Sequence, residues 1–258
     1  MAKSVDLPDI RAIERDSTDI FQVLQTLASA EAALRARDYL SAKKGYESVL
    51  LHDPDLGTAR AGLRRTLIAT GQAEEAARYI DDATSADAVL IRVLMGRSDH
   101  PTVELKTALE THQDARLWNA LGHLQDDQGH FAAARQAYAR ANLLGQRAGL
   151  AENNTGQSHW VAGEFEQALT SFEQAVQADP RDTRFDNNRR RALVKLGRVE
   201  FAIVGLTSEE ASVFLGQAGV QAEMEGEIRL AKLLYQKSLD LAPRHNPTIA
   251  ERLEALEQ

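Results

Sequence analysis

Residues 118–141, WNALGHLQDDQGHFAAARQAYARA, decide the fold of this chain. Trp118 is followed three and four positions later by leucine and glycine. The second half of the stretch places small and aromatic residues at helical spacing: Ala134, Tyr138 and Ala141. Both halves have the period of a helix with one apolar face, and Gly129 between them suits a tight chain reversal. The stretch predicts two closely packed antiparallel helices.

The same pattern recurs along the chain with a period of 34 residues. Glycines 129, 163 and 197 share one register. Around the second of them the pattern is repeated by Gly156, Ala168, Phe172, Ala175 and Pro180. Looser copies lie near both ends of the chain, at Ala30, Ala42, Tyr46 and Pro54 and at Gly219, Gly226, Ala231, Tyr235 and Pro243. A fixed period of this length is the signature of a repeat array.

This pattern of residues that recur every 34 positions resembles the tetratricopeptide repeat over nearly the whole chain. The resemblance implies an all-α solenoid, a right-handed superhelix of antiparallel helix hairpins in which each unit packs on its neighbours. We expect units near 23–56, 57–90, 115–148, 149–182 and 212–245, a degenerate unit at 91–114 and a shortened one at 183–211. Residues 1–16 are expected to form a flexible leader and 247–258 a capping helix, within a repeat domain of residues 17–258.

Composition excludes several classes of partner. Lys and Arg number 30 against 38 Asp and Glu, a net charge of −8 that disfavours nucleic acid. No apolar stretch approaches the roughly 20 residues that span a bilayer, so we expect no membrane insertion by this chain. Residues 1–8 lack the apolar core of a signal peptide. The chain has no cysteine, so it has no thiolate ligand or nucleophile.

Catalytic patterns are missing from the sequence. None of the 7 histidines is paired at the i, i+4 spacing that places two metal ligands on one helix face. No glycine-rich phosphate loop or G-x-S-x-G elbow occurs. Asp126 and Asp127 are adjacent and therefore point to different sides of a helix. We expect no enzyme activity, no cofactor and no metal, and interpret the chain as a non-catalytic scaffold that binds a protein or peptide.

The predicted binding surface is the concave groove, which the first helix of each hairpin lines in this repeat. The fifth position of three successive units faces inward and is Asn119, Asn153 or Asn187. An asparagine amide can both donate to and accept from one peptide unit, so such a row suits an extended backbone. The predicted groove residues are Asn119, His123, Asn153, Asn154, Gln157, Trp160, Arg184, Asn187, Asn188, Arg191 and Lys195. The alternative is that these asparagines only cap or solvate their helices.

Charge and an aromatic ring are expected to make the groove selective. Trp160 would be a flat apolar anchor, with a basic end of the groove facing Asp126 and Asp127. The segment 181–198 carries five more basic than acidic residues, seven against two. It forms either a solvated helix face or a docking patch for an acidic partner. Arg189 and Arg190 occupy positions where the repeat has leucine and glycine, so either this helix is displaced or its arginines extend to a partner.

Four short motifs resemble the TadD family of Flp/Tad pilus assembly proteins: LWNALG at 117–122, QAY at 136–138, NNTG at 153–156 and GEFEQAL at 163–169. The resemblance implies a tetratricopeptide lipoprotein on the periplasmic side of the outer membrane. Its partners would be the secretin or other components of a Tad-type secretion and pilus system, with a lipidated leader removed ahead of this sequence. The alternative is a cytoplasmic tetratricopeptide adaptor or chaperone-like module unrelated to pili.

Overall fold

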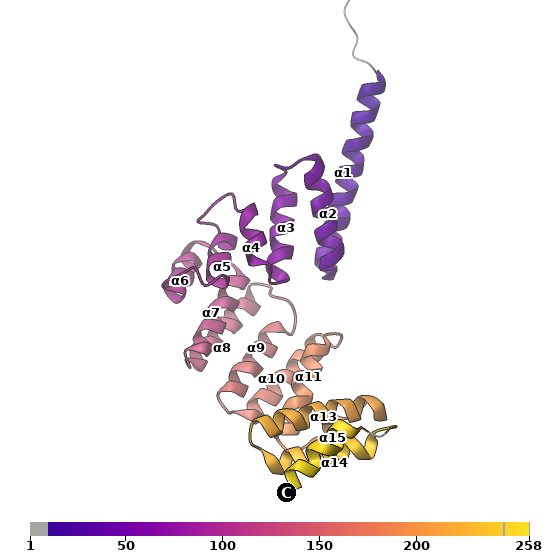
Figure 1. Cartoon of the computed structure of the whole chain (residues 1–258). Helices are drawn as coiled ribbons and strands as arrows, with labels where there is room; N and C mark the ends of the chain where they lie inside the picture. The colour runs from indigo at the N-terminus through magenta and orange to yellow at the C-terminus, as the bar shows by residue number, and fades with distance from the viewer. Residues whose placement is uncertain (1–9, 245, 258) are drawn as a thin grey trace, which may run out of the picture. The chain divides into compact units, whose positions relative to one another are not determined.

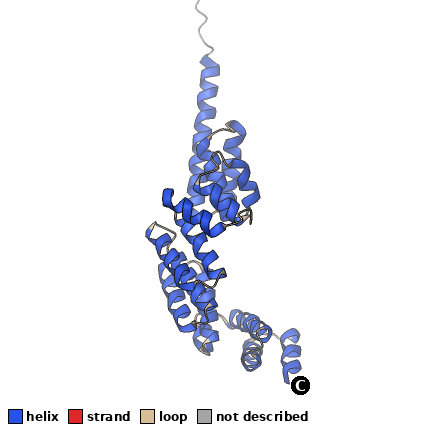
Figure 2. Ribbon diagram, turned by 90° about the vertical axis from the view of Figure 1, so that its left-hand side faces the viewer, coloured by secondary structure: helices blue, strands red, loops and turns tan. Residues whose placement is uncertain are grey.

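The computed structural model describes the backbone of residues 10–244 and 246–257 and the side chains of residues 20–244 and 246–256. Over this part of the chain the secondary structure consists of α-helices and one 3₁₀ turn, with no strand (Figures 1 and 2). The all-α fold expected from the sequence is confirmed. The chain divides into two compact units, Met1–Leu121 and Gly122–Gln258, and the boundary falls inside helix α7 (Ala115–Asp127).

The first unit is made of short helices that follow one long one. Helix α1 lies beside α2 and extends past its end (Figure 1). Residues 10–16 of the predicted leader are therefore helical, and residues 1–9 lie outside the described part. The helices are α1 (Ile10–Ala36), α2 (Tyr39–His52), α3 (Gly57–Ala69), α4 (Ala73–Ala76), η1 (Ala77–Tyr79), α5 (Ala86–Leu94) and α6 (Pro101–Thr111), followed by the start of α7.

Local signals set the ends of these helices. The Asp38 side chain accepts a hydrogen bond from the Ser41 amide at the start of α2, and Ser85 does the same for Ala88 in α5. Pro101 begins α6, where its missing N–H costs no hydrogen bond. The degenerate unit predicted at 91–114 therefore holds the end of α5 and the whole of α6.

A buried ion-pair network ties α3, α5 and α7 together in the first unit. The Asp87 carboxylate, 7% exposed, lies 2.6 Å from the Arg64 Nε and 2.6 Å from the Arg116 Nη1. Burial by itself would raise the pKa of Asp87, but the guanidinium groups of Arg116 and Arg64 outweigh it and lower the pKa. The charge of this buried carboxylate is therefore matched by its neighbours rather than by water.

The second unit continues from α7 with further helix hairpins. Its helices are α8 (Phe131–Leu143), α9 (Leu150–Val161), α10 (Phe165–Ala178), α11 (Thr183–Lys195), α12 (Val199–Ala202), α13 (Ser208–Met224), α14 (Ile228–Leu241) and α15 (Pro247–Glu257). The glycines predicted at the hairpin turns have positive φ, 75° at Gly129, 78° at Gly163 and 71° at Gly197. Only glycine adopts this conformation readily, which is why the 34-residue register marks the turns.

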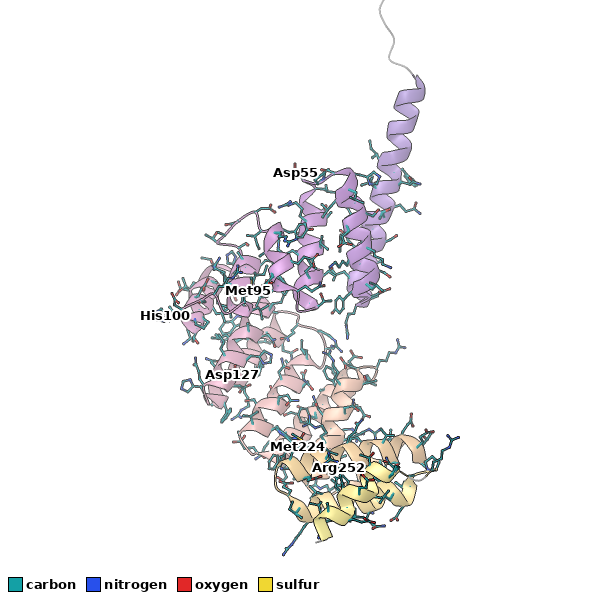
Figure 3. The ribbon with its side chains drawn as sticks, viewed as in Figure 1. Asp55, Met95, His100, Asp127, Met224 and Arg252 are labelled. Carbon is teal, nitrogen blue, oxygen red and sulfur yellow. The ribbon has the colours of Figure 1, made fainter. Side chains whose placement is uncertain are left out.

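The last helix caps the second unit. Ile249 of α15 is buried, and Leu253 and Leu256 pack against the same core. Arg252 of α15 pairs with Glu223 at 2.9 Å, close to Met224 at the end of α13 (Figure 3). In Figure 1, α13, α14 and α15 lie side by side and cross the direction of α10 and α11.

The shortened unit at 183–211 accounts for Arg189 and Arg190, which occupy positions where the repeat has leucine and glycine. Its second helix, α12, has only 4 residues. Arg190 is 7% exposed, and its guanidinium donates to Asp186 and to the backbone carbonyls of Ala202 and Val204. Arg190 therefore packs inside the unit and binds the chain where α12 ends. Arg189 donates to Asp186 at 2.6 Å.

Candidate functional site

Helices α9, α11 and α13 are the first helices of three successive hairpins in the second unit, and together they line a small pocket. Trp160 comes from α9, and Arg191, Val194 and Lys195 come from α11. The rest of the lining comes from α13, the turn after it and the start of α14: Ala218, Gln221, Ala222, Glu225, Glu227 and Leu230. The pocket encloses about 40 Å³, so it suits one anchored side chain rather than a cofactor.

Trp160 is held in place by its neighbours and carries a cation on its face. The rings of Trp160 and Phe165 meet edge to face with centroids 5.2 Å apart. The Arg191 guanidinium lies 5.5 Å from the Trp160 ring centroid, within the range of a cation–π contact. Arg191 is exposed, so its charge is presented at the mouth of the pocket.

Lys195 is less available to a partner than the sequence suggests. Its ammonium group binds Glu225 at 2.9 Å and also binds Glu227. Burial by itself would lower the pKa of Lys195, but the hydrogen bonds to Glu227 and Glu225 outweigh it and raise the pKa. Two basic and two acidic side chains thus line this pocket. Its charges are balanced, and Arg191 is the basic group on its exposed side.

Three of the predicted asparagines meet between α9 and α11. The Asn188 Nδ2 donates to the Asn153 Oδ1 at 2.8 Å, and the Asn153 Nδ2 donates to the Asn154 Oδ1 at 3.3 Å. Asn154 is buried, whereas Asn153 and Asn188 are half-buried. The 34-residue register predicts Asn187 opposite Asn153, but the structure links Asn153 to Asn188. Asn187 instead lines a second cleft on the other side of α11.

The other predicted groove residues are not among those that line the pocket. Asn119 is half-buried on α7 in the first unit. The His123 Nδ1 lies 3.2 Å from the Tyr138 hydroxyl, and Gln157 is half-buried on α9. Arg184 donates to Asp182 at 2.8 Å at the start of α11.

Of the acidic pair predicted to face the basic end, Asp126 has other contacts. Asp126 accepts hydrogen bonds from the Tyr138 hydroxyl at 2.7 Å and the Ser158 hydroxyl at 2.6 Å. These contacts join α7, α8 and α9, so Asp126 stabilises a helix crossing. Asp127 is exposed at the end of α7 (Figure 3).

Sequence reasoning missed the α13 side of the pocket. Gln221, Glu225 and Leu230 come from the unit that follows the shortened repeat, where the 34-residue count no longer applies. One signal was present: Glu225 and Glu227 flank Gly226, a turn glycine of the repeat ladder, and could have been matched to the basic residues at the end of α11.

Metal-binding groups and membrane-spanning helices would both bear on function. Among the side chains placed in the structure, no group of three His, Asp or Glu is arranged to hold a metal ion. No helix in the described part of the chain is long and apolar enough to cross a membrane.

Comparison with known proteins identifies the repeat. Family models described as tetratricopeptide repeats match residues 33–96 and 115–144. No curated protein sequence matches the chain.

Several solved structures are similar to this chain. The human IFIT1 dimer with m7Gppp-AAAA is 15% identical with a TM-score of 0.62, over 90% of this chain and 62% of that one. The Cut9–Hcn1 hetero-tetramer of the APC/C is 14% identical with a TM-score of 0.53, over 97% of this chain and 46% of that one. A tetratricopeptide repeat protein from Parabacteroides merdae is 14% identical with a TM-score of 0.47, over 92% and 99% of the two chains. This chain thus spans less than two thirds of the matched chains in the IFIT1 and Cut9–Hcn1 structures, and at these identities the likeness to those two concerns the fold alone. The chain is an all-helical protein that carries tetratricopeptide repeats.

Proposed function

We propose that the second unit is a protein-binding scaffold that holds an extended segment of a partner across α9, α11 and α13. Tetratricopeptide repeats indicate a protein-interaction scaffold, and repeat arrays bind partners on the surfaces that their first helices line. The observation that carries the proposal is the pocket of Trp160 and Arg191 on the same two helices, α9 and α11, as the hydrogen-bonded pair Asn153 and Asn188.

These side chains have the chemistry that an extended peptide needs. A primary amide has two N–H donors and a carbonyl oxygen with two lone pairs, so Asn153 and Asn188 keep capacity beyond their mutual bond. That capacity suits the N–H and C=O of a peptide backbone. Trp160 offers an apolar face for one side chain, and Arg191 favours a carboxylate next to it. The proposed role is non-catalytic.

A peptide display library selected against the whole chain tests this site. We expect the selected peptides to bind the Arg191→Glu variant at least about tenfold more weakly, a cost of about 1.4 kcal/mol. Arg191 is exposed, so this variant should fold normally. The matched control is Arg198→Glu, which changes an exposed arginine outside the pocket. Equal binding of the selected peptides to both variants would contradict the proposed binding site.

We further propose that the partner is a secretin or another component of a Tad-type pilus system, at the periplasmic side of the outer membrane. The motifs at 117–122, 136–138, 153–156 and 163–169 support this proposal. Purified secretin from such a system should bind the wild-type chain and lose affinity for Arg191→Glu. No binding at micromolar concentration would favour the alternative, a cytoplasmic adaptor.

A further inference from the structure

A second cleft opens in the second unit, beside the shortened hairpin and away from the groove. It encloses about 740 Å³. Its walls come from the end of α10, the start of α11, the loop after α12 and the start of α13. Its lining includes Val176, Asp186, Asn187, Leu206, Val213 and Phe214.

This cleft lies where the missing part of a helix would be. The second helices of the neighbouring hairpins, α10 and α14, have 14 residues each, and α12 has 4, a difference of ten. Ten residues of helix are about 15 Å long. In an antiparallel hairpin the last turns of the second helix lie beside the first turns of the first helix. Asp186 and Asn187 belong to those first turns of α11, and both line the cleft.

The chain's own contacts keep this space open. Arg190 binds the carbonyls of Ala202 and Val204, which fixes the chain as it leaves α12. A reciprocal capping box between Thr207 and Glu210 fixes the start of α13 only a few residues later. The segment between these two points is too short to add the missing turns. Val213 consequently remains 56% exposed on α13.

The charged residues that line the cleft favour one kind of partner helix. The ionisable groups in its lining are Asp186, Glu209, Glu210 and Arg190, three acids and one base. Arg190 is occupied by Asp186 and by backbone carbonyls. A helix placed like the missing turns would end near the start of α13. Basic residues in its last turn would suit both its own dipole and the acidic residues of the wall.

We propose that this cleft binds an amphipathic helix of a partner protein, with an apolar face and basic residues near its C-terminal end, which takes the place of the missing turns of α12. The site is independent of the groove formed by α9, α11 and α13. The interaction is of the helix-in-groove type, with apolar anchors spaced three and four residues apart.

The chain itself supplies a defined probe. A synthetic peptide of residues 228–241 with Asp240→Lys, IRLAKLLYQKSLKL, copies the second helix of the following hairpin and carries four basic residues, one of them in its last turn. Made with a helix-stabilising lactam bridge and a fluorophore, it is titrated with the full chain, and fluorescence anisotropy reports binding. We expect saturable binding, weakened at least about tenfold by Val213→Lys and by Glu209→Lys.

Two controls make the outcome decisive. Met224→Lys changes an exposed apolar residue at the other end of α13 (Figure 3) and should leave the affinity unchanged. Arg191→Glu in the groove should also leave it unchanged, so failure here is separable from failure of the groove. Circular dichroism checks that each variant folds. Absence of saturable binding, equal binding by Val213→Lys, or loss of binding in Arg191→Glu would each overturn the proposal.

Discussion

Glycine at the eighth position of a unit is required by the aromatic ring at the twenty-fourth. A Cβ on Gly122 would lie 2.4 Å from the Tyr138 ring, and one on Gly156 would lie 2.5 Å from the Phe172 ring. Such distances are impossible without movement of the ring or the helix. Sequence alone indicates this pairing because both positions recur with the repeat period.

Gly156→Ala is therefore expected to destabilise the second unit by about 1–3 kcal/mol, the usual cost of overpacking. The control is Gly57→Ala, because a Cβ there meets nothing within 4 Å. That control should leave the free energy of unfolding unchanged or raise it slightly, since alanine favours helix. Thermal and urea unfolding followed by circular dichroism measure both. Equal losses would show that the close crossing does not limit stability.

Arg190 is a residue whose role the repeat pattern could not predict. The repeat pattern has glycine at this position. The hydrogen bonds from Arg190 to the carbonyls of Ala202 and Val204 form only because α12 ends early. We expect Arg190→Ala to cost about 1.5–3 kcal/mol, the range for hydrogen bonds to a charged group. The adjacent exposed Arg191→Ala is the control and should change unfolding little. A similar small loss for both would mean that Arg190 does not hold the end of α12.

Asp87 predicts a pH dependence of stability. Its pKa in the folded chain is lowered from the ordinary value of 3.8, so its contribution is present above about pH 3.8 and is lost as the pH falls through the lower folded pKa. Asp87→Asn should melt below the wild type at neutral pH, and the difference in melting temperature should narrow as the pH falls below 3.8. Asp127→Asn, an exposed control, should show no such narrowing. A gap independent of pH would contradict the role of the Arg64 and Arg116 contacts.

At the level of elements, the repeat register predicts the hairpins well and the shortened unit only in part. It places the turns at Gly129, Gly163 and Gly197 because each turn needs positive φ. It also predicts that the unit at 183–211 is short. It does not predict that α13 begins at Ser208, because the capping box of Thr207 and Glu210 is a local signal outside the repeat.

The candidate site, too, could be predicted from the sequence only in part. Trp160, Arg191 and Lys195 share one surface in the sequence register, and they line one pocket in the structure. The bond from Asn188 to Asn153 and the pairing of Lys195 with Glu225 depend on the rotation between neighbouring hairpins. A linear count of 34 residues does not contain that rotation, so these contacts could not be predicted.

The two asparagines of the predicted row are expected to behave differently. Asn153→Ala removes the acceptor of Asn188 and should weaken the binding of groove-selected peptides by about tenfold, with a stability loss near 1 kcal/mol. Asn187→Ala should leave those peptides unaffected, because Asn187 lines the cleft on the other side of α11. Binding titrations and melting curves of both variants decide the matter. Equal loss of peptide binding in both variants would support the predicted row, in which Asn187 lies in the groove opposite Asn153.

At the level of the whole molecule, the two compact units have separate hydrophobic cores. The core of the first gathers Leu63 and Tyr46 with the residues around them, and that of the second gathers Phe172 and Tyr235. Repeat arrays unfold in parts when their units are stabilised mainly by nearest neighbours. Each unit is therefore expected to have its own stability.

Leu63→Ala tests this expectation, because Leu63 is fully buried in the first core. Removing a buried leucine side chain costs about 2–5 kcal/mol. The chain has two tryptophans, Trp118 in the first unit and Trp160 in the second, so a Trp118→Phe background leaves Trp160 as the fluorescent reporter. In urea, Leu63→Ala should then leave the Trp160 midpoint unchanged while the circular dichroism curve gains an earlier transition. The matching change in the second core, Leu234→Ala, should move the Trp160 midpoint instead. If Leu63→Ala shifts the Trp160 fluorescence transition and the circular dichroism transition together, the chain unfolds as one cooperative unit. Destabilising the first unit would then also destabilise the groove in the second.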